Sequence, residues 1–181
     1  MATIGNRFPE CHRQEFTERN LTPGRILYLW CEFTTPPKDK YLVLACRGAP
    51  PLLFLINSRI HPFIASRPDL LNCQVELRAS EYDFLSHDSF VDCSKVVYSF
   101  DEQAIKNQLL SDLRKIKGEI NQTTKNEIVK AVRNSRTISL YRKQLIIDSL
   151  QESHTRESFQ VASLSVKAFS SSVFPAPFVN L

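Results

Sequence analysis

The chain has 181 residues, of which 43% are hydrophobic and 23% charged, a balance typical of an ordinary soluble globular domain. A formal net charge of +4 is too small to indicate a polyanion-binding surface unless the charges are unevenly placed. They are unevenly placed, because residues 101–150 contain ten Lys and Arg against six Asp and Glu and account for the whole excess.

Apolar runs and cysteines indicate the compartment. The sequence has no run of about 18 apolar residues and no apolar signal-peptide core at its start, so we expect a cytoplasmic protein without membrane contact. Its five cysteines are odd in number and form no C-x-x-C pair, so we expect reduced thiols, no metal site and no cofactor. Cys31, Cys46 and Cys73 lie in apolar runs and are expected in the core.

The N-terminal part divides into an extension and the start of a domain. Residues 1–21 are polar, mixed in charge and aperiodic, so we expect an extension that covers part of the domain of residues 22–150. The first strand is predicted at 25–33, where the side chains alternate with a period of two. Tyr28 and Trp30 lie together on the outward face of this strand.

Further strands follow in the first hundred residues. Lys38, Asp39 and Lys40 read as a charged turn between the first two strands. The fifth strand is expected to be kinked. The predicted strands after the first are 41–46, 52–57, 73–78 and 90–98.

The hydrophobic period changes from strand to helix after Tyr98. Ser99 and Glu102 form a capping box that begins a helix, which Gly118 ends. Thr124 and Glu127 repeat the same signal at the start of a short helix. A last helix is predicted at 137–150, and the serine-rich segment 151–181 is expected to be a mobile tail.

Five short strands followed by helices indicate an α+β fold. We expect a small, strongly bent antiparallel sheet closed into a barrel, with the C-terminal helices packed on it. The strand count alone does not choose between types of barrel.

Four short segments, in the same order, resemble segments of the MazF/PemK family of toxin ribonucleases and together span about residues 22–135. The segments are Pro23-Gly24-Arg25-Ile26, Lys40-Tyr41-Leu42-Val43-Leu44, Ser89 to Val97, and Lys117-Gly118-Glu119-Ile120 leading to the helix of Glu127 to Val132. The resemblance implies an SH3-like barrel, often a homodimer, that cleaves single-stranded RNA without a metal ion and is held inactive by a cognate antitoxin protein.

The resemblance also assigns catalytic positions. The family's catalytic Arg falls at Lys40, which keeps the charge but cannot make a planar two-point contact with phosphate, and Tyr41 replaces the family's Pro. Its catalytic Ser or Thr falls at Ser58.

The loop after the third predicted strand adds candidates of its own. RNA cleavage needs a group that titrates and donors for the phosphate, and Arg59 and His61 complete the predicted catalytic set with Lys40 and Ser58. The alternative is that Arg59 is a solvated loop charge and that His61 packs in its loop. His87 is a further candidate base, oriented by Asp88 or Asp92, or else a residue that caps a turn.

Five residues are candidate RNA contacts. Tyr28 and Trp30 offer flat faces for base stacking, or a dimer contact instead. Asn57 adds a polar group, and Lys130 and Arg133 add charge on the C-terminal helices, where the alternative is an ordinary solvated face.

Two functions from different classes follow. The first is a ribonuclease toxin, and the second is a catalytically silent SH3-like barrel that binds protein or nucleic acid. The lysine at position 40 favours the second, and Ser58 with its neighbours favours the first.

Overall fold

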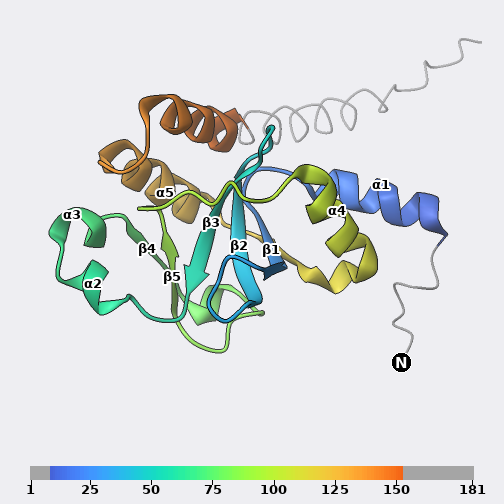
Figure 1. The fold of residues 1–181 in the computed structure, drawn as a ribbon, viewed down its shortest axis with the longest axis horizontal. Helices are drawn as coiled ribbons and strands as arrows, with labels where there is room; N and C mark the ends of the chain where they lie inside the picture. The colour runs from blue at the N-terminus through green and yellow to red at the C-terminus, as the bar shows by residue number, and fades with distance from the viewer. Residues whose placement is uncertain (1–8, 153–181) are drawn as a thin grey trace, which may run out of the picture.

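The computed structural model describes residues 9–152, which fold into helices packed around one sheet (Figure 1). The strands are β1 (Arg25–Cys31), β2 (Lys38–Cys46), β3 (Leu52–Asn57), β4 (Gln74–Leu77), β5 (Ser89–Asp92) and β6 (Ile116–Glu119). The helices are α1 (Glu10–Asn20), α2 (Pro62–Ala65), α3 (Pro68–Leu71), α4 (Glu102–Ser111) and α5 (Gln122–Asn134), with 3₁₀ turns η2 (Ala79–Glu81) and η3 (Leu113–Lys115). Residues 140–152 are also helical.

The strands form one antiparallel sheet in the order β4-β5-β3-β2-β1-β6. This confirms the predicted α+β class, with an antiparallel sheet and helices that follow it in the chain. The sheet curls but stays open, because β4 and β6 are its two edges and do not pair with each other. Closure into an SH3-like barrel is therefore not confirmed.

Both faces of the sheet are buried, because successive residues of β1 enter two different cores. Ile26 belongs to the core that also contains Ile128 of α5 and Ile146 of the last helix. Leu27 belongs to the core on the other face, which contains Leu109 of α4. Side chains of a strand alternate between its faces, so this single strand connects the two cores.

The predicted helix after Tyr98 is shorter than the sequence indicated. Its N-cap is Asp101, whose side chain accepts a hydrogen bond from Ala104 N at 2.6 Å, and the helix ends at Ser111 rather than at Gly118. The segment that follows forms β6, which pairs with the outer edge of β1. Pairing with β1 satisfies backbone groups that a longer helix would satisfy internally, so tertiary pairing overrides the helical period here.

The N-terminal extension contains a helix that the sequence did not indicate. Helix α1 packs against α4, and Thr17 of α1 is buried there. Glu18 of α1 accepts a hydrogen bond from Arg47 and forms an ion pair with Lys106 of α4. The extension therefore covers the domain, as expected, but it does so as an ordered helix.

Two strand predictions change at their ends. The predicted turn Lys38-Asp39-Lys40 is the first part of β2, which places Lys40 in a strand. The predicted fifth strand 90–98 is only β5, and the chain then turns before Val97 exchanges backbone hydrogen bonds with Leu53 at 2.8 and 2.9 Å. Instead of one kinked strand, this segment therefore has β5, which pairs with β4 and β3, and a separate bridge at Val97.

The C-terminal helices begin a few residues from their predicted starts. Helix α5 has Asn121 as its N-cap, with Thr124 N donating to Asn121 Oδ1 at 2.8 Å. The last helix covers 140–152 instead of 137–150, and the rest of the predicted tail lies outside the described residues. Among residues 9–152, no helix is both long and apolar enough to cross a membrane.

The cysteines behave as predicted. Cys31, Cys46 and Cys73 are buried, and all five thiols are free. Burial raises the pKa of the Cys31 thiol to about 11, so this residue stays an unreactive thiol at neutral pH.

Candidate functional site

A hollow of about 230 Å³ lies beside β1, β2 and the end of β3, where several of the predicted site residues meet. Its remaining wall is the loop that leads into β5. We call it the aromatic groove. It is lined by Tyr28, Asp39, Lys40, Tyr41, Ile56, Ser58, Phe84, Leu85, Ser86, His87 and Ser89.

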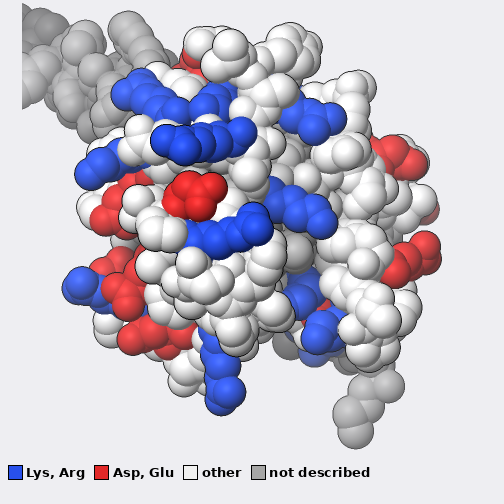
Figure 2. Space-filling model, turned by 60° about the vertical axis from the view of Figure 1, so that its left-hand side comes forward, with Lys and Arg blue, Asp and Glu red and all other residues white. Residues whose placement is uncertain are grey.

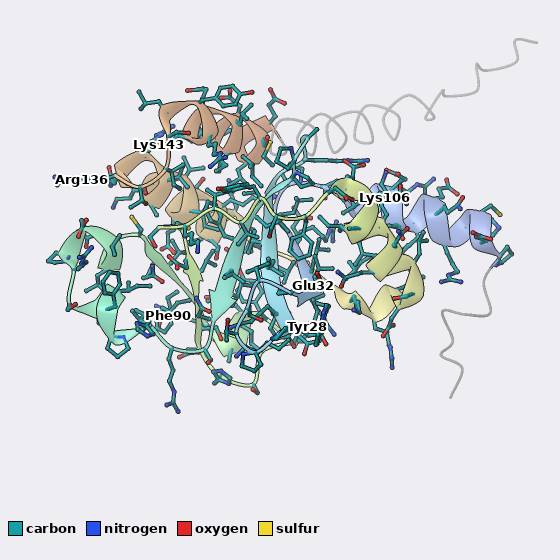
Figure 3. All side chains as sticks on the ribbon, viewed as in Figure 1. Tyr28, Glu32, Phe90, Lys106, Arg136 and Lys143 are labelled. Atoms are coloured by element: carbon teal, nitrogen blue, oxygen red, sulfur yellow. The ribbon has the colours of Figure 1, made fainter. Side chains whose placement is uncertain are left out.

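Three aromatic rings form a row along this groove. Tyr28 and Tyr41 are direct cross-strand partners, and their ring centroids lie 4.7 Å apart. Phe84, from the loop before β5, continues the row at 5.0 Å from Tyr41. Figure 3 labels Tyr28, which belongs to β1. All three residues are partly buried, so each still exposes part of its side chain, and nucleic-acid bases stack on aromatic side chains of this kind.

A cation lies over one end of the aromatic row. The Nζ atom of Lys117 is 5.5 Å from the centroid of the Tyr28 ring. Lys117 is placed there by an irregularity in the pairing of β6, where Ile26 pairs with Gly118 but Leu27 pairs with Ile116. The extra residue at such a bulge is aimed differently from its neighbours. The arrangement therefore joins a positive charge to a stacking surface.

Lys40 lines the groove, but its ammonium group is held by Asn57. The distance from Lys40 Nζ to Asn57 Oδ1 is 3.2 Å. Lys40 pairs with Leu29, so it lies on the opposite side of β2 from Tyr41. Burial lowers the pKa of the Lys40 ammonium, and the nearby charge of Lys38 lowers this pKa further. Lys40 is therefore a cation that gives up its proton more easily than an ordinary lysine.

Ser58 and His87 line the groove from two different segments. The Oγ atom of Ser86 lies 2.9 Å from His87 Nδ1, so Ser86 is the residue that orients this ring. The predicted partners of His87 are wrong. Asp88 accepts a hydrogen bond from Ala79 N at 2.8 Å, and Asp92 is occupied by Gln74 and Ser94.

Three other predicted site residues lie outside the lining of the aromatic groove. His61 is the N-cap of α2, where its Nδ1 accepts from Phe63 N at 3.2 Å, which matches the alternative of a loop residue. Arg59 is exposed in the same loop. Trp30 is 44% exposed on β1, two residues beyond Tyr28 on the same strand face.

The groove, together with the cation over its Tyr28 ring, involves residues that the sequence analysis did not single out as site residues. Tyr41 could have been found from the pairing of the first two strands, because it lies opposite Tyr28. Phe84 and Lys117 come from a loop and from a strand that were not predicted, so no sequence signal placed them near Tyr28. Burial raises the pKa of the Tyr28 hydroxyl, which therefore stays protonated at neutral pH.

The basic residues of the C-terminal segment divide into two groups. Four pair with carboxylates: Lys106 with Glu18 and Glu102, Arg114 with Asp112 at 2.9 Å, Lys115 with Asp39 at 3.7 Å and Lys125 with Glu119 at 2.6 Å. Within residues 9–152, six others form no ion pair with a carboxylate: Lys117, Lys130, Arg133, Arg136, Arg142 and Lys143. Of these, Arg142 lies over the Tyr98 ring at 4.1 Å and Lys143 donates to Arg133 O at 3.0 Å. Figure 2 shows that Lys and Arg gather on the upper part of one face of the molecule.

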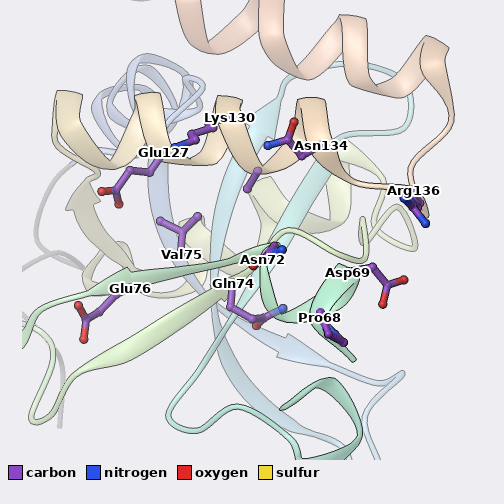
Figure 4. A pocket seen from close by; sticks show the side chains of 11 residues that line it. Pro68, Asp69, Asn72, Gln74, Val75, Glu76, Glu127, Lys130, Asn134 and Arg136 are labelled. Atoms are coloured by element: carbon purple, nitrogen blue, oxygen red, sulfur yellow. The ribbon is translucent and has the colours of Figure 1, made fainter. Parts of the chain in front are cut away.

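Lys130 lies at a second, larger hollow of about 1050 Å³ between α5, α3 and β4 (Figure 4). We call it the edge hollow. It is lined by Pro68, Asp69, Asn72, Gln74, Val75, Glu76, Glu127, Lys130, Ala131, Asn134 and Arg136. Arg133 is exposed on α5 and does not line it. Of the predicted RNA contacts, Tyr28 lines the aromatic groove, Trp30 and Asn57 lie on neighbouring parts of β1 and β3, and Lys130 and Arg133 lie on α5.

Within the described residues, no three His, Cys, Asp or Glu side chains gather into a possible metal site. The chain matches no model of a known protein family, and a search of curated proteins finds no relative.

Proposed function

We propose that this protein binds single-stranded RNA in the aromatic groove and cleaves it without a metal ion, in the manner of the MazF/PemK family that it resembles. The observation that carries the proposal is the row of three rings beside Lys40, Ser58 and His87 in one hollow. Stacking of a base on an aromatic side chain contributes about 1–3 kcal/mol and does not require a particular base. Only unpaired bases reach such rings, which favours a single strand.

The groove residues supply the groups that this cleavage requires. In the proposed reaction the 2′-oxygen of the RNA attacks the adjacent phosphorus while the neutral imidazole of His87 takes the proton of the 2′-hydroxyl. The Ser58 hydroxyl donates to a phosphate oxygen. The bond from phosphorus to the 5′-oxygen breaks, and the 5′-oxygen takes a proton from a water molecule. The products are a 2′,3′-cyclic phosphate and a 5′-hydroxyl, and the hydroxide left from the water takes the proton of His87, which restores the neutral imidazole.

A second candidate function is RNA binding without cleavage. The observation that favours it is the hydrogen bond from Lys40 to Asn57, which draws the ammonium away from the ring row. A lysine at this position also lacks the two-point contact of an arginine with phosphate. In this case the aromatic groove holds RNA, and the hydrogen bond from Lys40 to Asn57 stabilises the end of β3 beside β2.

The remaining expectations belong to this proposal as well. The resemblance favours an SH3-like arrangement for the curled sheet. It also favours a homodimer in the cytoplasm, with a cognate antitoxin that covers the groove. Arg59 and His61 are weaker catalytic candidates than His87, because they lie outside the lining of the aromatic groove. Arg133 is a better candidate for a remote phosphate contact than Lys130, which shares the edge hollow with three carboxylates.

The binding part is tested with a fluorescein-labelled 12-residue oligo(U) and fluorescence anisotropy. Tyr28→Ala and Tyr41→Ala are each expected to weaken binding by about tenfold, because each removes a stacking surface. Trp30→Ala is the matched control, because Trp30 is an aromatic residue on the same strand face but outside the lining of the groove. This change is expected to alter the affinity by less than about twofold. No binding by a folded wild-type protein would refute both candidate functions.

The cleavage part is tested with a long RNA and mapping of the new 5′-ends. His87→Ala and Ser58→Ala are each expected to lower the cleavage rate by about 10²–10³. His61→Ala is the matched control, because it removes an imidazole outside the aromatic groove. Binding without any cleavage by the wild-type protein would select the second candidate function.

A further inference from the structure

The strand β4 is an edge of the sheet, and its outer backbone groups have no strand partner among the described residues. The direction of these groups follows from one hydrogen bond, in which Cys93 N donates to Cys73 O at 2.9 Å. Hydrogen-bonded pairs alternate along an antiparallel ladder, so Val75 and Leu77 also bond to β5. The N–H and C=O groups of Gln74 and Glu76 therefore point away from β5.

The edge hollow lies beside these residues. Gln74, Val75 and Glu76 of β4 form one wall, and Lys130 with Asn134 of α5 forms the facing wall. Figure 4 shows α5 running above β4 with these side chains between them. An edge strand next to a helix, with a hollow between them, is the arrangement in which an extended peptide adds to a sheet. The hollow of about 1050 Å³ has room for such a segment.

The charges in the edge hollow favour a basic peptide over a polyanion. Three carboxylates, from Asp69, Glu76 and Glu127, line it against the two cations Lys130 and Arg136. Glu76 and Glu127 lie at one end, together with the single cation Lys130, and Arg136 and Asp69 lie at the other (Figure 4). Within residues 9–152 Glu127 forms no ion pair, and Glu76 is only 3.7 Å from Arg78 in an exposed pair. The end with two carboxylates suits a Lys or Arg side chain and repels phosphate.

We propose that the edge hollow binds an extended peptide of a partner protein, which adds to β4 as a further strand. Its main chain bonds to the outward groups of Gln74 and Glu76, and a Lys or Arg of the peptide contacts Glu76 and Glu127. This site is separate from the aromatic groove and does not depend on any activity toward RNA.

The proposal is tested by NMR with ¹⁵N-labelled protein and two degenerate nine-residue peptide pools. The pools have Lys or Glu at the central position and are otherwise random. At millimolar concentration the Lys pool is expected to shift the amide signals of Gln74 and Glu76, and the Glu pool is expected to bind at least fivefold more weakly. No shift at these two amides, or shifts produced equally by both pools, would overturn the proposal.

Variants at one position separate the backbone contact from the charge. Glu76→Pro removes an outward N–H that β5 does not use, so the β4–β5 ladder is kept and binding of the Lys pool is expected to fall at least tenfold. Glu76→Gln is the matched control, which keeps the N–H and should reduce only the preference for the Lys pool. A third pool has the same composition as the Lys pool but carries N-methyl groups on alternate backbone amides, so it cannot donate the hydrogen bonds of an added strand. This pool is expected to bind no better than the Glu pool. Equal binding by this methylated pool, or displacement of the peptide by oligo(U), would show a different kind of site.

Discussion

The side chain of Gln108 in α4 bonds to both main-chain polar groups of Trp30 in β1. Trp30 N donates to Gln108 Oε1 at 2.7 Å, and Gln108 Nε2 donates to Trp30 O at 3.3 Å. Strand β6 pairs with β1 only from Arg25 to Leu27, so this amide takes the place of a strand residue farther along the same edge. The contact attaches α4 to the sheet that it covers.

Gln108→Ala should lower the free energy of unfolding by about 1 kcal/mol, because it removes two hydrogen bonds to a backbone that water reaches. Gln108→Glu keeps the acceptor and loses the donor, so its effect should be smaller. Asn107→Ala, one residue away and exposed, is the control and should be close to neutral. Urea unfolding measures all three, and equal stability of the 107 and 108 variants would contradict the role of Gln108.

Asp101→Ala should destabilise the protein by about 1 kcal/mol, since it removes the side chain that caps α4 at Ala104 N. Ser99→Ala should have almost no effect, although the sequence pattern favours Ser99 as the cap. Thermal unfolding monitored by circular dichroism compares the two variants. A larger loss for Ser99→Ala would place the start of the helix two residues earlier.

The ionic cluster between α1, α4 and Arg47 should make stability depend on pH in the acidic range. Hydrogen bonds from Arg47 and Lys106 lower the pKa of Glu102 to about 2, from an ordinary value of 4.5. The unfolded chain binds this proton more tightly, so the contribution of Glu102 is complete above pH 4.5 and is lost as the pH falls toward 2. Partly exposed pairs of this kind contribute about 0.2–1 kcal/mol each.

Glu102→Gln should therefore be less stable than the wild type at pH 7 and should lose less stability between pH 5 and pH 2, a range set by the lowered pKa of Glu102. Glu32→Gln is the control, because Glu32 is exposed and forms no ion pair among the described residues. Urea unfolding at a series of pH values gives, for each protein, the slope of the free energy of unfolding against pH. Parallel slopes for Glu102→Gln and the wild type would show that the cluster does not lower this pKa.

The ammonium of Lys40 should titrate below the ordinary lysine value of 10.5, because burial and the charge of Lys38 lower its pKa. Lys38→Gln removes the second cause, so the pKa of Lys40 should rise in this variant and stay below 10.5. The Cε chemical shift of Lys40, followed by NMR against pH, measures both midpoints. A Lys40 midpoint unchanged by Lys38→Gln would exclude the contribution of Lys38.

Periodicity predicted the central strands well, because their side chains alternate between two buried faces. The predicted third strand, 52–57, has the bounds of β3, and the first strand lies within its predicted range as β1. Apolar surroundings also placed Cys31, Cys46 and Cys73 correctly in the core. In these elements the apolar residues of the segment itself mark the strand, because both faces of the central sheet are buried.

Periodicity failed where a neighbour far away in the sequence supplies the stabilising contact. Leu113 and Ile116 continue the helical stripe of α4, but Ile116 begins β6, because the edge of β1 is available to pair with it. Helix α1 has few apolar residues to reveal it, and its ion pairs with Arg47 and Lys106 form only in the folded domain.

The sequence by itself determined the α+β class, the central strands and the buried thiols. It also placed Tyr28, Lys40 and Ser58 in or directly beside the first three strands. Only the tertiary structure decided that Phe84 lines the same groove as Tyr28 and that Lys117 lies over the Tyr28 ring. It likewise decided that His61 caps a helix while His87 lines the groove. It also decided that β4 is an edge with a hollow beside it. The physical reason is that alternation and capping depend on neighbours in the chain, whereas grooves and sheet edges depend on which distant segments pair.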